Sequence, residues 1–247
     1  LTFLLSKNME VNQRNVEQLV RHKNNEDKIS EFLGRLQNLI EEDESQELKS
    51  ISDSISRVFL KPDEIQEPEQ IKEKYQEIIK LGERLERLLE EDSLRNGNIR
   101  EVLSNLKDNI DFIKSINQFS NYLQIPININ NNTETAKLYV FKEGKRNKAI
   151  DPRNATILLA LDLPHSGHLE SLVAVQGKSI NITFRIEDKR VGELIKNHSE
   201  ELGNSLSAKG YSLKPIKIIN LGEPFSLMVL ESMMNNNKDR VHFDERV

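Results

Sequence analysis

The first 124 residues place hydrophobic side chains at every third or fourth position, the spacing of one buried helix face. This pattern predicts a short helix after the N-cap residue Asn12, a helix over residues 27–42 and a third helix that begins at Ser45. Two longer helices are predicted over residues 68–91 and 98–123. Because a short turn containing Asn96-Gly97-Asn98 joins them, we expect an antiparallel helical hairpin.

We interpret the hydrophobic stripes of these five helices as core, since a closed helical bundle needs only one apolar stripe per helix. The stripes comprise Val16, Leu19 and Val20; Ile29, Phe32, Leu33, Leu36 and Ile40; Leu48, Ile51, Ile55, Val58 and Phe59; Ile71, Tyr75, Ile78, Leu81, Leu85, Leu88 and Leu89; and Ile99, Val102, Leu103, Leu106, Ile110, Ile113, Ile116 and Phe119. The alternative interpretation is that part of the hairpin stripe forms an exposed groove for a partner.

At Ile125 the period of the pattern changes to two, which is typical of strands. Strands are predicted over residues 125–129, 136–141, 156–163, 169–176 and 179–186, and a type II′ turn at Gly177-Lys178 joins the last two. Asp188 is expected to cap one helix that ends at Gly210, with an inner face of Val191, Leu194, Ile195, Leu202 and Leu206. A final strand is predicted over residues 211–219.

These elements predict an α+β fold: a helical N-terminal half with a long antiparallel hairpin, then a small antiparallel or mixed sheet with one packed helix. We expect a helical domain over residues 1–124, an α+β module over residues 125–230 and a polar tail over residues 231–247.

The composition of the chain excludes several classes of function. The net charge of −5 and the absence of a long basic run argue against nucleic acid as a partner. The chain has no cysteine, which excludes disulfides and thiol chemistry. Its first apolar run, Phe3-Leu4-Leu5, is too short for membrane insertion. The chain begins at Leu1 rather than Met, so we expect a fragment or a processed form.

Candidate catalytic or metal-binding residues are few. His165 and His168 are the only histidines close in sequence, and with Asp162 they form a conceivable three-ligand zinc site, although loop histidines are usually exposed. His198 is expected to be packed in the core. No glycine-flanked serine and no phosphate-binding glycine loop is present, so we expect no enzyme activity, no cofactor, no metal and no small-molecule substrate.

Residues 125–219 resemble the C-terminal domain of flagellar hook-length control proteins. The residues that carry the resemblance are Ala136 to Phe141, Leu159 to Leu163, Gly167-His168-Leu169, Gly177 to Phe184 and Leu206 to Tyr211. The family usually has Leu-Gly before the hairpin strand, whereas Ser166 precedes Gly167 here, and Pro164 lies two residues earlier. The helical half is similar to the upstream helices of the longer, clostridial-type members.

The resemblance implies a cytoplasmic protein that is also exported by the flagellar type III apparatus. It implies a switch of export specificity through contact with the cytoplasmic domain of an export-gate subunit. The residues expected to make this contact are Pro164, His165, Ser166, Gly167, His168 and Leu169. The alternative is an adapter or scaffold that binds another protein through the helical hairpin of residues 68–124.

Overall fold

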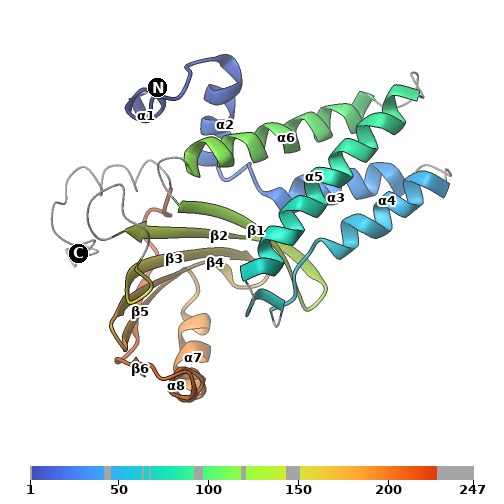
Figure 1. Ribbon diagram of the computed structural model, residues 1–247. Coiled ribbons are helices and arrows are strands. Elements are labelled where there is room, and N and C mark those ends of the chain that lie inside the picture. The colour runs from blue at the N-terminus through green and yellow to red at the C-terminus, as the bar shows by residue number, and fades with distance from the viewer. Residues whose placement is uncertain are drawn as a thin grey trace. The chain divides into compact units, whose positions relative to one another are not determined.

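The computed structural model describes residues 2–41, 46–62, 64–66, 68–91, 97–117, 121–142 and 151–226. The fold is α+β, as the sequence predicts, with helices in the N-terminal half and a mixed sheet with two further helices after them (Figure 1). None of the helices in these ranges has the length and hydrophobicity that crossing a membrane requires.

The described residues of the N-terminal half form helices of 3 to 24 residues. They are α1 (Thr2–Ser6), α2 (Gln13–Lys23), α3 (Ile29–Glu41), α4 (Gln46–Arg57), the 3₁₀ helix η1 (Glu64–Gln66), α5 (Pro68–Glu91) and α6 (Gly97–Asn117). The C-terminal half contains β1 (Asn121–Ile129), β2 (Asn132–Lys142), β3 (Asn154–Leu163), β4 (Gly167–Gln176), β5 (Ser179–Ile186), α7 (Lys189–Asn197), α8 (Ser199–Ala208), β6 (Ser212–Leu213) and β7 (Lys217–Asn220).

The chain divides into two compact units that do not follow the halves of the sequence. The first unit contains residues 1–12, 119–122 and 138–247, and the second contains residues 13–118 and 123–137. Strands β1 and β2 therefore contribute residues to both units. The second unit is called the helical unit below, and the first is called the sheet unit.

The core of the helical unit confirms most of the predicted stripes. All five apolar residues predicted for α3 are buried, as are all five predicted for α4 and the segment after it. α3 packs against both α4 and α6, and α5 contacts α4 and α6. Val20 is an exception, because it is half exposed while Gln18 and His22 of the same helix are buried. The predicted residues Ser45, Asn96 and Phe119 lie outside the described ranges.

Helix α6 ends at Asn117, earlier than the predicted end at residue 123, and β1 has begun by Asn121. Tertiary contacts explain the difference. Gln124 is fully buried within β1, and its polar groups form hydrogen bonds with residues distant in sequence. Its side-chain oxygen accepts from the Ile29 N–H at 3.0 Å, and its carbonyl accepts from the Tyr75 hydroxyl at 2.5 Å. Local helix propensity is a weak preference that such contacts override.

In the sheet, the strand order is β1-β2-β3-β4-β5-β6, and β7 also pairs with β5. β3, β4 and β5 are antiparallel neighbours, whereas β6 and β7 run parallel to β5, which makes the sheet mixed. The predicted final strand is thus two short strands. Pro215 lies between them and has no N–H to donate to a ladder.

The single helix predicted between Asp188 and Gly210 is also two helices. Asp188 caps α7 as predicted, by accepting from the Arg190 N–H at 2.8 Å, and Gly210 follows α8 with φ +82°. The break falls at His198, and it lets α7 contact β5 while α8 contacts β6. Leu194, predicted to face inward, is consequently 57% exposed.

A buried carboxylate organises the polar interior of the helical unit. Asp27, just before α3, is 2% exposed. Its Oδ1 lies 2.6 Å from Lys137 Nζ of β2, and its Oδ2 lies 2.6 Å from His22 Nδ1 of α2. Gln124 of β1 donates to the same Oδ2 at 2.7 Å. Burial raises the pKa of Asp27, but His22 and Lys137 outweigh burial and hold that pKa well below its usual range.

The replacement Asp27→Ala leaves the Lys137 ammonium buried without its carboxylate. We therefore expect the free energy of unfolding to fall by about 3 to 5 kcal/mol, as for other broken buried ion pairs. Chemical denaturation followed by circular dichroism measures the change.

The matched control is Asp108→Ala, which removes a partner of Arg14 on the solvent-exposed side of α6. Exposed pairs contribute little, so a loss below about 1 kcal/mol is expected. Equal losses for the two variants would show that Asp27 does not have this role.

Candidate functional site

The six residues predicted to contact a partner form the turn between β3 and β4 and the start of β4. The hairpin pairs Leu163 with Gly167, and the Ser166 N–H donates to the Leu163 carbonyl at 3.1 Å. Pro164 and His165 are exposed at the tip, Ser166 and Gly167 are half-buried, and His168 and Leu169 continue into the sheet. The structure therefore brings all six residues together in one segment.

Gly167 closes the turn in a conformation that suits glycine alone. Its φ is +70°, in the left-handed region that side chains with a Cβ rarely adopt. A Cβ at this position would also collide with the carboxylate of Glu187, the residue that follows β5. That carboxylate accepts a hydrogen bond from the His168 N–H at 2.8 Å. The turn is thus attached to the end of β5 as well as to its own hairpin.

His168 is not a solvent-exposed loop histidine, contrary to the expectation for both residues of the pair. Its Nδ1 lies 2.6 Å from Asp162 Oδ1, directly across the hairpin, and its Nε2 lies 3.2 Å from Glu170 Oε1. Burial lowers the pKa of His168, but the hydrogen bonds to the two carboxylates outweigh burial and raise it to about 9. At neutral pH the ring is therefore a cation that donates to a carboxylate on each side.

Glu170 forms the centre of this arrangement and is fully buried. Its Oε2 accepts from Arg185 Nη1 of β5 at 2.5 Å, and its Oε1 accepts from the backbone N–H of Phe225 at 2.5 Å. Arg185 also donates through Nη2 to the carbonyl of Glu223 at 2.8 Å. We call Asp162, His168, Glu170 and Arg185 the ion cluster.

The hydrophobic pattern of the sequence does not predict the ion cluster. Arg185 alternates with the apolar residues of its strand and is nevertheless buried, at 9% exposure. A signal was present: the two-residue turn at Gly177-Lys178 fixes the register that places Glu170 opposite Arg185. Opposite charges in directly paired positions share one face of a sheet and can form a pair.

The ion cluster holds the segment that follows β7 against the sheet. Phe225, at the end of this segment, is 7% exposed. Its ring packs edge-on against Tyr139 and Phe141 of β2, with centroid distances of 5.1 and 5.9 Å, and Tyr139 stacks on Tyr122 at 4.6 Å. Gly192 of α7 approaches Ile186 of β5 and Ile218 of β7. These two residues alternate with Arg185 and Ile219 along their strands, so α7 lies on the face of β5 and β7 opposite to Arg185.

The arrangement fixes the position of the His168 ring. Both ring nitrogens of His168 are engaged by carboxylates, which leaves no ring lone pair for a metal ion. Within the described ranges, no group of three His, Cys, Asp or Glu residues could hold a metal. His198, expected in the core, is exposed instead and lies 3.2 Å from Glu201 on the surface of α8.

Removing the central carboxylate tests the ion cluster. Glu170→Ala leaves the Arg185 guanidinium and the Phe225 N–H without their acceptor, so the free energy of unfolding should fall by about 3 to 5 kcal/mol. Urea denaturation of the full chain gives the value. In the control Glu193→Ala, the lost partner is Lys196 in an exposed pair on α7, and the expected loss is below about 1 kcal/mol. A small loss for Glu170→Ala would contradict this role.

The raised pKa of His168 makes the stability of the sheet unit depend on pH. The folded state binds the proton more tightly than the unfolded chain, in which a histidine has a pKa of about 6.5. The stabilisation that protonated His168 adds to the folded state is fully present below about pH 6.5 and is lost as pH rises through about 9. It should amount to about 1 to 2 kcal/mol, because partial solvent exposure weakens it.

The measurement is the free energy of unfolding of the wild type and of His168→Gln at about pH 6 and about pH 9.5. The wild type should lose more stability than the variant over this range. Parallel losses would mean that His168 is not stabilised as a cation in the folded state.

Residues 143–223 match the family model described as flagellar hook-length control protein FliK. The match covers about a third of the chain and includes β3 to β7, with α7 and α8. The chain as a whole matches no curated protein and no solved structure. The resemblance of the C-terminal residues to hook-length control proteins is thereby confirmed over this span. Over residues 143–223, the chain is similar to the flagellar hook-length control family.

Proposed function

We propose that this protein is a hook-length control protein that switches the substrate specificity of flagellar type III export by binding the export gate. The proposed contact is the turn from Pro164 to Leu169, and the proposed partner is the cytoplasmic domain of an export-gate subunit. The observation that carries the proposal is the exposed tip of this turn, Pro164 and His165, inside the segment that matches the family.

The way in which the turn is held supports a binding role. Glu187 accepts the His168 N–H, and Asp162 and Glu170 fix the His168 ring, so the base of the turn is connected to three strands. A surface that is already ordered loses little conformational entropy when a partner binds. Exposed loops on a rigid scaffold are common positions for binding residues.

The proposal assigns no catalytic step to the protein. The charged groups of the ion cluster have partners within the chain, and the Glu187 carboxylate beside the turn accepts the His168 N–H. Binding to an export gate places the protein in the cytoplasm when the switch occurs, and passage through the type III apparatus would follow the same route as other export substrates.

The role of the turn can be tested with residues at its tip, since any side chain at Gly167 would strain the turn itself. The double variant Pro164→Glu with His165→Glu should weaken binding of the full chain to the export-gate cytoplasmic domain of the same organism by about tenfold or more, as expected for residues at the centre of a contact. Isothermal titration calorimetry measures the dissociation constant.

Lys178→Glu provides the control, because Lys178 is exposed in the turn between β4 and β5, at the opposite end of β4. Its affinity should stay within about twofold of the wild type. If the wild type does not bind the domain, or if both variants bind equally well, the proposed contact is wrong. In cells, the tip variant should produce overlong hooks without filaments, whereas Lys178→Glu should produce normal flagella.

A further inference from the structure

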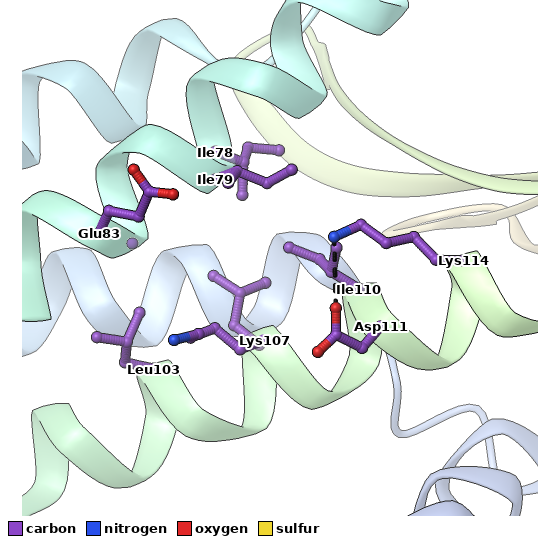
Figure 2. A pocket seen from close by; sticks show the side chains of 10 residues that line it. Ile78, Ile79, Glu83, Leu103, Lys107, Ile110, Asp111 and Lys114 are labelled. Atoms are coloured by element: carbon purple, nitrogen blue, oxygen red, sulfur yellow. Dashed lines mark hydrogen bonds and ion pairs between the residues drawn. The ribbon is translucent and has the colours of Figure 1, made fainter.

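Two grooves flank α5 in the helical unit, and they differ in charge. The groove between α5 and α6 has a volume of about 110 Å³ and a largely apolar floor that includes Ile78, Leu103 and Ile110 (Figure 2). The groove between α4 and α5 is larger, at about 370 Å³. We call the second one the basic groove, because Arg57, Lys74, Lys80 and Arg84 line it, with Glu77 as its only acidic residue.

In the α5–α6 groove each lysine has a carboxylate partner. Lys114 Nζ lies 3.3 Å from Asp111 Oδ1, as the dashed line in Figure 2 marks, and Lys107 Nζ lies 2.5 Å from Glu86 Oε1. Glu83 lines the same groove. The charges of this groove are therefore balanced within the unit, which is the usual state of charged side chains on a helical bundle.

The basic groove lacks this balance. Its one carboxylate, Glu77, is paired with Lys74 at 3.0 Å. Arg84 donates to the neutral hydroxyl of Ser50 at 2.8 Å. No ion pair joins Arg57, Lys80 or Arg84 to an acidic side chain in the described parts of the chain, so three positive charges remain along a single groove. This local excess contrasts with the net charge of −5 of the whole chain.

The spacing of these charges follows from the helices. Lys80 and Arg84 are one turn apart on the same face of α5, which places their Cβ atoms about 5 to 6 Å from each other. Arg57 is the last residue of α4, on the other side of the groove. The half-buried Leu81 provides apolar surface between them, whereas Val58 also lines the groove but is only 1% exposed. The site thus combines a row of cations with an accessible apolar residue.

We infer that the basic groove binds an acidic peptide segment of a partner protein, with carboxylates toward Arg57, Lys80 and Arg84 and an apolar side chain on Leu81. An isolated small anion would gain nothing from Leu81. Nucleic acid fits poorly, because three charges neutralise few phosphates and the rest of the chain is acidic. An acidic and partly apolar peptide complements both features.

This inference concerns the helical unit, outside the span that matches the family, and does not depend on the proposed switch function. The basic groove involves α4 and only one helix of the predicted hairpin, α5, so it differs from the apolar hairpin groove considered from the sequence. Among the described residues, the exposed large hydrophobic side chains are Leu5, Val11, Val20, Leu194 and Ile219, and none of them belongs to α5 or α6.

The test uses the full chain and a fluorescein-labelled peptide of repeated Leu-Glu-Glu-Leu units, followed by fluorescence anisotropy. The wild type should bind this peptide and bind its Leu-Gln-Gln-Leu counterpart at least about tenfold more weakly. The double variant Arg57→Glu with Lys80→Glu should also lose about tenfold or more in affinity, since like charges now face the peptide.

The control variant is Lys107→Glu with Lys114→Glu, which reverses two charges in the charge-balanced groove and should alter affinity by no more than about twofold. Circular dichroism establishes that each variant is folded. Three results would overturn the inference: no binding to the wild type, equal loss in the two groove variants, or full displacement of the peptide by millimolar inorganic phosphate, which would indicate a small-anion site.

Discussion

The buried ion pair between Glu170 and Arg185 is the interaction on which the geometry of the sheet unit depends. Neither charge could be buried alone, because desolvation of an unpaired ion costs several kcal/mol. Together they order three further groups: the His168 ring, the Phe225 N–H and the Glu223 carbonyl. The helical unit uses the same principle at Asp27, where one buried carboxylate receives groups from α2, β1 and β2. In each unit, segments distant in sequence are joined by a carboxylate that accepts several donors.

This organisation connects the core of the sheet unit to its surface. Glu170 holds His168, the second residue of β4, which leaves the exposed turn. Phe225 connects the ion cluster to the aromatic residues, because its N–H donates to Glu170 while its ring packs against Tyr139 and Phe141. The tip of the turn carries no charged group of the cluster, so its exposed residues are available for contact while its base remains fixed. That combination fits the contact proposed for this turn.

Hydrophobic periodicity predicted the helices that bury a single apolar face. It missed the features that depend on hydrogen bonds and ion pairs between residues distant in sequence. The stripes of α3 and α4 were predicted correctly because each helix buries one apolar face. The early end of α6 could not be predicted, since it depends on Gln124 bonding to residues far away in sequence. The burial of Arg185 and the position of Phe225 likewise follow from long-range pairing. For the candidate site, the partner-binding segment stays a prediction. The proximity of Asp162 to His168 could be expected from the sequence, but not the burial of Glu170, which determines how that segment is held.

Hydrogen–deuterium exchange of the full chain, with and without the export-gate cytoplasmic domain, tests the central claim most directly. Amides of the turn from His165 to Leu169 should exchange more slowly when the domain is bound, while those of the β4–β5 turn at Gly177-Lys178 should be unchanged. Protection that appears only in the helical unit would contradict the account, because the partner would then bind a surface outside the hook-length control domain.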